Sequence, residues 1–452
     1  MTTAFEIEIG RLMTRFNTPG LSIDMLAAGK RHSAYMGRLV EGQPDKVTRD
    51  ARYATVCLIK LLIAIDILMM VEKGLVSLDA AIADYLPELA EGPKAKGKLI
   101  KLRHLLSHTG GYRSCPVKTL MPLAHESWKN CVQFLHDTEQ MFAPGTVFDD
   151  DHLSYIILGQ IIERVKETPV LTAIAEDILK PLRIAPHTRP GDRAHPEIYT
   201  GRHSWNREIK KWEPQEDTYE GPDAASSATS YFSMSSRDIL RVGEALMDNY
   251  AGPGAGIITP FIRSSIFTEQ VLLPREYSPL RTNRWSVRAF GMGMATFRDG
   301  HRGCFTVGRG QNCAMVYDAA RKSLVALAMN SPNAPERDAV LNMAFGRFAN
   351  DASIVPEENK LDMDFASFMG PFTTRDVGGV YLGFTPEPIE IFADPRGFTV
   401  RMDKEDRYRI EASPENRLVM HARMPMSLGL FQDPASQRPC LMLGMHAFRK
   451  VN

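Results

Sequence analysis

A cysteine and a lysine stand three residues apart at the start of a long apolar segment. The segment ATVCLIKLLIAIDILMMVEKG contains Cys57 and Lys60. Residues 56–71 are apolar on every side of a helix, which predicts a buried helix rather than a surface helix. Thr55 is placed to cap its start, and Gly74 is placed to end it in the left-handed conformation. Cys57 then falls in the first helical turn, and Lys60 lies on the same face.

This pair has the chemistry of an activated nucleophile. A thiol in the first turn faces unsatisfied backbone N–H groups and the positive end of the helix dipole, and both favour the thiolate. A cationic Lys60 favours the thiolate further, whereas an amine made neutral by burial can serve as the base. A structural interpretation is also open, in which Cys57 is a small core residue and Lys60 extends outward to solvent.

The composition is that of a globular protein with more than one domain. The chain has 452 residues, 44% of them hydrophobic and 24% charged, with a formal net charge of zero. A neutral chain without a basic run is not typical of a nucleic-acid binder. The most apolar run carries Lys60 and Asp66, and the N-terminal sequence MTTAFEIEIGRLMTRF lacks the apolar core of a secretory signal. We therefore expect no membrane attachment and a cytoplasmic location, where the six scattered cysteines are free thiols.

Strand signals lie at both ends of the first 350 residues, with helical patterns between them. Residues 5–49 predict an amphipathic helix followed by short strands, and QNCAMVYDAARKSLVALAMN predicts a hairpin with its turn at residues 318–322. This layout predicts an antiparallel sheet closed by the two ends of the unit, with a helical lobe inserted between them. We expect this first domain to cover residues 1–350, followed by a polar linker over residues 351–370.

The last part of the chain, residues 371–452, predicts a small all-β domain. Short strands with turn residues between them are typical of a barrel or sandwich. The predicted strands are VGGVYLGF, IEIFAD, GFTVRMD, RYRIEAS, RLVMHAR and CLMLGMHAFRKV.

Several motifs occur in the order found in one known family. They are Val71 to Gly74, Leu78-Asp79, Tyr85-Leu86-Pro87, LLSHTGG at residues 105–111, APGTVF at residues 143–148, SYIILGQIIERV and SMSSRDILRVGEALM. Together they resemble the serine β-lactamase and penicillin-binding-protein-like family, in its branch of class C-like esterases, D-aminopeptidases and acyltransferases. The resemblance implies an α+β, β-lactamase-like fold: an antiparallel sheet flanked by helices, plus a helical lobe. The C-terminal strands resemble the lipocalin-like domain that often follows this core.

Two of the family's motifs are altered at residues that bear chemistry. The nucleophilic Ser of the family's S-x-x-K motif falls on Cys57, and its Lys is retained as Lys60. The family's second motif, Tyr-x-Asn, falls on Asp150 and His152. A thiol needs less help from a base than a hydroxyl does, so a Cys nucleophile tolerates loss of the Tyr. Asp150 is then expected to fix Lys60 as a cation, and His152 to relay protons.

The third motif, Lys/His-Thr/Ser-Gly, falls on Thr306-Val307-Gly308. The cationic member is missing there, although Arg309 is adjacent. The resemblance implies an oxyanion hole formed by the backbone N–H of Cys57 and one between Gly308 and Gly310.

These residues predict a cysteine-dependent acyltransferase or hydrolase that forms a thioester. Its partners would be a small-molecule acyl donor (an ester, thioester or amide) and an acceptor, which water can be. The alternative is a catalytically degenerate β-lactamase-like protein that serves as a binding or scaffold protein. No cofactor is implied, and no metal site is expected, since adjacent carboxylates on one loop cannot converge on one ion. A homo-oligomer is left open.

Three further residues are assigned from their surroundings. Tyr112 and Trp285 are expected to line the substrate pocket between the sheet and the helical lobe. His108, in LLSHTGGY, is expected to be structural, with its ring capping nearby backbone groups.

Overall fold

The computed structural model describes most of the first 348 residues and the strands that follow. The described residues are 3–55, 57–91, 97–112, 128–137, 140–186, 198–206, 209, 211–215, 233–273, 285, 287–308, 310–332, 334–348, 370–373, 389–394, 397–401, 407–412, 418–420, 426–436, 439–443 and 446–450. The predicted linker lies outside them except for its last residue, Gly370, which begins a strand. The predicted domain boundaries therefore stay predictions.

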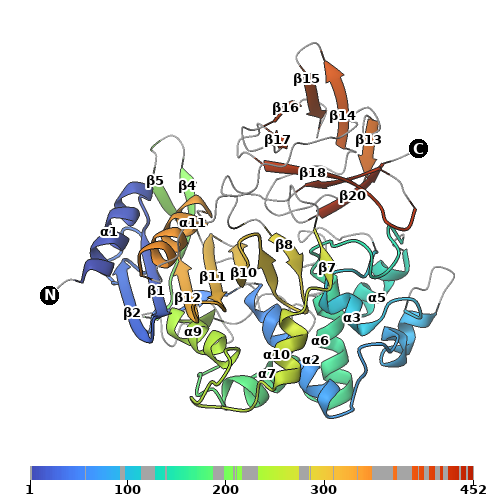
Figure 1. Cartoon of the computed structure of the whole chain (residues 1–452), viewed down its shortest axis with the longest axis horizontal. Helices are drawn as coiled ribbons and strands as arrows, with labels where there is room; N and C mark the ends of the chain where they lie inside the picture. The colour runs from blue at the N-terminus through green and yellow to red at the C-terminus, as the bar shows by residue number, and fades with distance from the viewer. Residues whose placement is uncertain are drawn as a thin grey trace.

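An eight-stranded antiparallel sheet forms the centre of the first unit (Figure 1). Its order is β2-β1-β12-β11-β10-β9-β8-β7, so strands from the two ends of the unit lie side by side. β1 pairs with β12 from Leu21↔Met329 to Leu26↔Leu324, which confirms the predicted closure. The strands are β1 (Gly20–Ala27), β2 (Lys30–Gly37), β7 (Val271–Leu272), β8 (Val287–Phe290), β9 (Ala295–Phe297), β10 (Arg302–Gly308), β11 (Gln311–Asp318) and β12 (Ser323–Met329).

Helices cover both faces of this sheet (Figure 1). Because side chains alternate along a strand, Cys313 and Met315 of β11 join the core of α2 and α9, whereas Ala314 and Val316 join that of α1 and α11. The predicted helical lobe is confirmed between β2 and β7. The helices are α1 (Ala4–Phe16), α2 (Leu58–Glu72), α3 (Leu102–Leu106), α5 (Trp128–Asp137), α6 (Leu153–Lys166), α7 (Val170–Ile174), α9 (Ser236–Ala245), α10 (Pro260–Phe267) and α11 (Ala334–Met343), with shorter helical turns η1 (Ile82–Asp84), η2 (Pro87–Ala90), η3 (Ala175–Leu179) and η6 (Ala344–Phe348).

Helix α2 is buried on all sides, as its sequence predicts. Twelve of its 15 residues are buried, so surrounding packing fixes its position. The helix ends in a Schellman motif, in which the Leu75 N–H donates to Met70 O and the Gly74 N–H donates to Val71 O. Gly74 has a φ of 68°, which confirms the predicted left-handed end.

Two short strand pairs flank the large sheet. They are β3 (Tyr53–Ala54) with β6 (Ser233–Met234), and β4 (Arg202–Asn206) with β5 (Lys211–Gln215). β3 leads directly into α2, so its pairing helps to fix where that helix begins.

The C-terminal strands form a closed barrel in which neighbours pair antiparallel in chain order. This confirms an all-β unit, while its assignment as lipocalin-like stays a prediction. Five of the six predicted segments overlap observed strands, and VGGVYLGF lies outside the described residues. The strands are β13 (Gly370–Thr373), β14 (Ile389–Asp394), β15 (Gly397–Arg401), β16 (Arg407–Ala412), β17 (Leu418–Met420), β18 (Met426–Gln432), β19 (Pro439–Leu443) and β20 (His446–Lys450).

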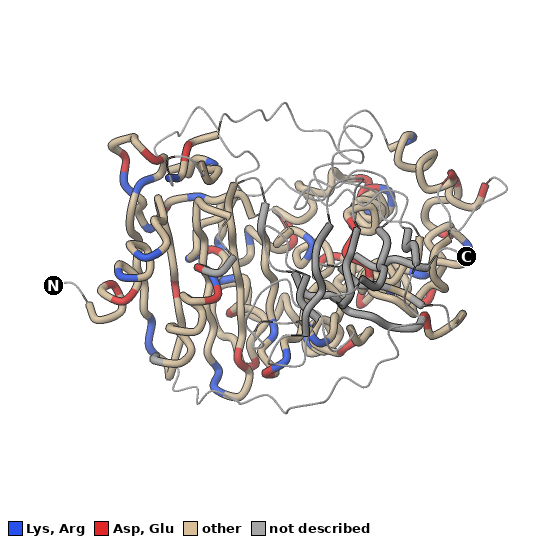
Figure 2. Tube along the Cα trace, turned by 90° about the horizontal axis from the view of Figure 1, so that it is seen from above, with Lys and Arg blue, Asp and Glu red and all other residues tan. Residues whose placement is uncertain are grey.

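Basic and acidic residues are interspersed along the described chain (Figure 2). This distribution agrees with the zero net charge of the sequence. Among the described helices, none combines the length and the hydropathy needed to cross a membrane.

Candidate active site

Cys57 stands at the entrance of α2, one position before the helix begins. It is the N-cap residue with helical angles, φ −79° and ψ −7°, rather than a residue of the first turn. The Leu58 N–H donates to Thr55 O at 2.8 Å, so the chain already turns before Cys57. The side chain is half-buried and forms no disulfide. Cys57 is therefore partly exposed at the start of a buried helix.

Lys60 is paired with Asp150, as the sequence predicts. Its Nζ donates to Asp150 Oδ1 at 2.6 Å, and Lys60 is only 5% exposed. Burial disfavours the cation, but the charges of Asp150 and Cys57 and the hydrogen bond that Lys60 donates to Asp150 together raise the pKa of Lys60. The pKa of Asp150 is lowered, because the neighbouring Lys60 and His108 outweigh its burial. Of the two states that the sequence leaves open, the structure supports the cationic Lys60.

The thiol does not have the low pKa that its position predicts. Burial raises the pKa of Cys57, Lys60 lowers it, and Asp150 raises it, with a net increase. The expectation that its position and Lys60 lower the pKa of this thiol is therefore wrong, because burial outweighs the effect of Lys60. The helix N-terminus and the spacing to Lys60 are visible in the sequence, whereas the desolvation that outweighs them is not.

Backbone hydrogen bonds join the LLSHTGG segment to the loop that carries the second motif. The Gly145 N–H donates to Thr109 O at 2.7 Å, and the Asp149 N–H donates to His108 O at 2.9 Å. Gly111 has a φ of 73°, and a Cβ at this position would lie 2.3 Å from Phe142 O. This close approach requires glycine, which explains one residue of the motif.

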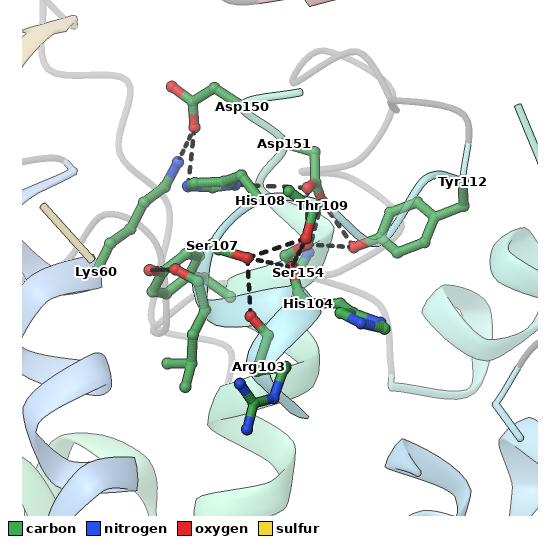
Figure 3. Close-up of polar contacts among 12 residues, drawn as sticks. Lys60, Arg103, His104, Ser107, His108, Thr109, Tyr112, Asp150, Asp151 and Ser154 are labelled. Atoms are coloured by element: carbon green, nitrogen blue, oxygen red, sulfur yellow. Dashed lines mark hydrogen bonds and ion pairs between the residues drawn. The ribbon is translucent and has the colours of Figure 1, made fainter. Parts of the chain in front are cut away.

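The ring of His108 lies between two carboxylates (Figure 3). Its Nε2 is 3.2 Å from Asp150 Oδ1, and its Nδ1 is 3.5 Å from Asp151 Oδ2. Asp151 in turn accepts from the Ser154 N–H at 2.6 Å and from the Tyr112 hydroxyl at 2.9 Å. The expectation that His108 caps backbone groups is therefore wrong for its ring, which contacts the charged residues of the site. The sequence shows three adjacent carboxylates in FDDDH and a histidine in LLSHTGG, but nothing in it indicates that they meet.

His152 is the N-cap residue of α6, and its imidazole is neutral at ordinary pH. Burial and the charge of Lys60 lower its pKa to about 3. Its buried Nδ1 forms no hydrogen bond with any residue that the structure describes. No hydrogen bond between His152 and Cys57 occurs in the described part of the chain, so its role as a proton relay stays a prediction.

The third-motif segment lies beside the entrance of α2. Gln311, which sequence reasoning missed, accepts from the Ala54 N–H at 2.6 Å through its side-chain oxygen. Gly308 pairs with Gln311 across the β10–β11 hairpin. Gly310 has a φ of 71°, and a Cβ there would lie 2.6 Å from the backbone nitrogen of His203. The β10–β11 hairpin that carries the third motif therefore lies next to the residues that lead into α2.

The remaining residues of the third motif have different outcomes. Thr306 is 2% exposed, and its side chain contacts the thiol of Cys313, its partner across β10 and β11. Arg309 lies outside the described residues. The oxyanion hole stays a prediction.

Tyr112 and Trp285 are core residues, which corrects their assignment to a substrate pocket. Tyr112 is 3% exposed, and its hydroxyl is occupied by Asp151 and Ser154. Trp285 is 2% exposed, and its Nε1 donates to Asn342 Oδ1 of α11 at 3.0 Å. Large aromatic side chains bury more apolar area in a core than at a solvent-facing wall, and here they do so.

The family model described as Beta-lactamase matches residues 8–345. The chain belongs to the Beta-lactamase family. This membership places it in a superfamily of hydrolases and acyltransferases, and it confirms the resemblance seen in the motifs.

Curated relatives in the family are distant. Penicillin-binding protein 4 of Amycolatopsis lactamdurans is 26% identical over 175 residues, which cover 38% of this chain and 45% of the relative. Esterase EstB of Burkholderia gladioli is 24% identical over 208 residues, which cover 40% of this chain and 52% of the relative. The chain thus spans about half the length of the curated relatives that it matches.

A solved structure extends the similarity over the whole chain. The crystal structure of SurE superposes with a TM-score of 0.76 at 18% identity, covering 99% of this chain and 98% of SurE. At this identity the likeness establishes the fold alone.

Proposed function

We propose that this member of the Beta-lactamase family transfers acyl groups through a thioester on Cys57. The donor would be a small-molecule ester, thioester or amide, and the acceptor would be water or a second small molecule. The observation that carries the proposal is the Lys60–Asp150 ion pair, 2.6 Å long, within one turn of the partly exposed Cys57.

The ion pair supports catalysis because the fold alone does not require it. Removing a cation from water costs several kcal/mol, and apolar residues of similar size often replace buried ion pairs without loss of stability. Lys60 lies in a helix whose other first-turn residues are all apolar. A charge kept at this position, next to Cys57, fits a role in stabilising an anion at the sulfur.

The proposed reaction has two balanced steps. The Cys57 thiol first loses its proton to solvent, and the thiolate attacks the acyl carbonyl, forming a C–S bond and breaking the bond to the leaving group. The Lys60 ammonium stabilises the thiolate, and the leaving group departs with a proton from solvent or from this ammonium. The acceptor then attacks the thioester, gives up its proton, and releases the Cys57 thiolate.

The raised pKa of Cys57 favours the second candidate, a degenerate binding or scaffold protein. A mostly protonated thiol is a weak nucleophile at neutral pH. The two candidates differ in alkaline solution, where an acyl-enzyme would form rapidly and a degenerate site would not.

Intact-mass spectrometry after incubation with p-nitrophenyl acetate distinguishes the acyl-transfer enzyme from the degenerate binding protein. The proposal expects one acetyl group per chain, formed faster as the pH rises and absent in Cys57→Ala. Cys304→Ala is the matched control, because Cys304 is also a free and half-buried thiol, and it should still be acetylated. An adduct that survives Cys57→Ala, or no adduct at any pH, would exclude the thioester mechanism.

A further inference from the structure

His108 occupies a strained and enclosed position. Its φ is 55°, in the left-handed region that non-glycine residues rarely adopt. The residue is 1% exposed, and its ring packs against the rings of Phe148, Tyr155 and Phe290 at centroid distances of 5.0–5.6 Å. A strained conformation persists only where its surroundings over-determine it, and such sites are concentrated where function requires them.

The two carboxylates that face this ring are held very differently. Asp151 is 5% exposed and accepts from the Ser154 N–H, the Ser154 hydroxyl and the Tyr112 hydroxyl. It therefore keeps its orientation without His108. The Asp150 side chain is 27% exposed, and its contacts in the described part of the chain are to Lys60 and His108, both through Oδ1. Among the described residues, His108 is thus the one besides Lys60 that contacts the Asp150 carboxylate directly.

The order of contacts runs from the core to the thiol. Asp151 is anchored to α6 and faces Nδ1 of the His108 ring at 3.5 Å, an electrostatic contact rather than a hydrogen bond. The Nε2 of the ring contacts Asp150, and Asp150 contacts Lys60 (Figure 3). Lys60 acts electrostatically on Cys57. Other described groups also act on the thiol or on Lys60. They are Asp150, Asp151, His152, Cys304 and Tyr155, whose ring lies 5.6 Å from the Lys60 ammonium.

We propose that His108 is a positioning residue that holds the Asp150 carboxylate on the Lys60 ammonium through its Nε2. Without this contact, the partly exposed Asp150 carboxylate turns toward solvent. Lys60 then lies unpaired in an apolar helix, where burial favours the neutral amine. The thiolate of Cys57 loses its stabilising cation. This loss outweighs the removal of the unfavourable Asp150 charge, because Lys60 acts on the thiol more strongly than Asp150 does. The inference rests on the proposed function of that thiol.

Substituting His108 by Gln or by Asn tests the roles of the two ring nitrogens one at a time. The amide nitrogen of His108→Gln reaches toward the place of Nε2, next to Asp150, whereas that of His108→Asn reaches toward the place of Nδ1, next to Asp151. Asn tolerates the left-handed backbone better than Gln does. A purely structural role therefore favours Asn, and a positioning role through Asp150 favours Gln.

The readout is the pH dependence of Cys57 alkylation by iodoacetamide, followed by intact mass. We expect His108→Asn to raise the apparent pKa of the thiol by about one unit relative to His108→Gln, which slows alkylation about tenfold at a fixed pH below both values. His108→Asn should nevertheless melt at the same or a higher temperature. In an Asp150→Asn background the two variants should react alike, because the carboxylate that His108 holds is gone.

Equal or faster alkylation of His108→Asn would overturn the inference, as would a difference that persists in the Asp150→Asn background. If the variants at residue 108 do not fold, Asp151→Asn provides a second test, in which the same alkylation profile is measured with His108 unchanged. This substitution removes the carboxylate that faces Nδ1 of the ring, and an unaltered alkylation profile would likewise overturn the inference. Alkylation needs no acyl donor, so a failure of acyl transfer itself appears separately, as the missing acetyl adduct.

Discussion

The thiol of Cys57 experiences two charges of opposite sign, and the balance between them decides its reactivity. Lys60 lowers its pKa and Asp150 raises it, against a background of burial that raises it most. Lys60 is thus the one group among these that favours the nucleophilic form. Removing the Lys60 charge should therefore raise the pKa of the Cys57 thiol.

Lys60→Met tests this balance. The variant keeps the length of the side chain and its apolar packing but leaves Asp150 as an uncompensated negative charge near the thiol. We expect the apparent pKa of Cys57 to rise by at least about one unit, so that alkylation at a fixed pH slows roughly tenfold or more. The measurement is the alkylation rate over a pH series. Lys73→Met, at the exposed C-terminal cap of the same helix, should leave the rate unchanged, and an equal effect of both variants would contradict the argument.

Two aligned patterns, one with Cys57 and Lys60 and one with Asp150, predicted the Lys60–Asp150 pairing that the structure shows. Motif spacing failed where the outcome depends on desolvation, as for the pKa of the thiol, and where the partners are distant in sequence. His108 and Asp150 are separated by 42 positions and meet only because backbone hydrogen bonds join their loops. No local pattern around either residue contains that information.

Helix α2 contains a second buried charge, two turns beyond Lys60. Asp66 is fully buried, and the ammonium of Lys166, at the end of α6, donates to both Asp66 and Asp177. Burial raises the pKa of Asp66, and the attraction of Lys166 only partly offsets this. The pair joins α2, α6 and the η3 turn through one cation.

Lys166→Met should therefore destabilise the protein by roughly 3–5 kcal/mol, because it leaves an unpaired carboxylate in the core. Lys180→Met is the matched control: its ion pair with Glu176 is also 2.6 Å long, but the two side chains are 71% and 58% exposed, so its loss should cost less than about 1 kcal/mol. Urea unfolding measures both. Adding Asp66→Leu to Lys166→Met should recover most of the lost stability, and a further loss instead would show that the charge is not the cause.

Across the whole molecule, hydrophobic patterning predicted the topology better than it predicted individual strands. The sheet closed by β1 and β12 follows from strand signals at both ends of one unit, which only a few connections can satisfy. In the barrel, β13 and β18 were not predicted. β13 contains Pro371, and β18 contains Ser427 and Gly429, residues that weaken a strand pattern in isolation. Pairing with neighbouring strands outweighs these local preferences.

The stability of the molecule should depend on pH through buried groups in separate regions. Burial lowers the pKa of His104 to about 4 and that of His152 to about 3, and it also lowers the pKa of His203. These histidines bind protons more readily when the chain unfolds, so acidification destabilises the folded state. Glu336 acts in the opposite direction, because burial raises its pKa to about 7 and the folded chain binds the proton first.

Between about pH 6.5 and pH 5 the three histidines outweigh Glu336, so the unfolded chain takes up more protons than the folded chain and stability should fall by up to about 2 kcal/mol. The raised pKa values of Asp66 and Glu244 act in the same direction as Glu336 and reduce this fall. In Glu336→Gln the opposing group no longer titrates, so the fall should be about twice as steep over the same range. The same variant should gain stability near about pH 8, where wild-type Glu336 is a buried anion bonded to Thr18. Urea midpoints over a pH series give both slopes. A wild-type protein that becomes more stable on acidification, or equal slopes for the two proteins, would mean that solvent or a compensating charge reaches these groups and that their burial does not control their ionisation.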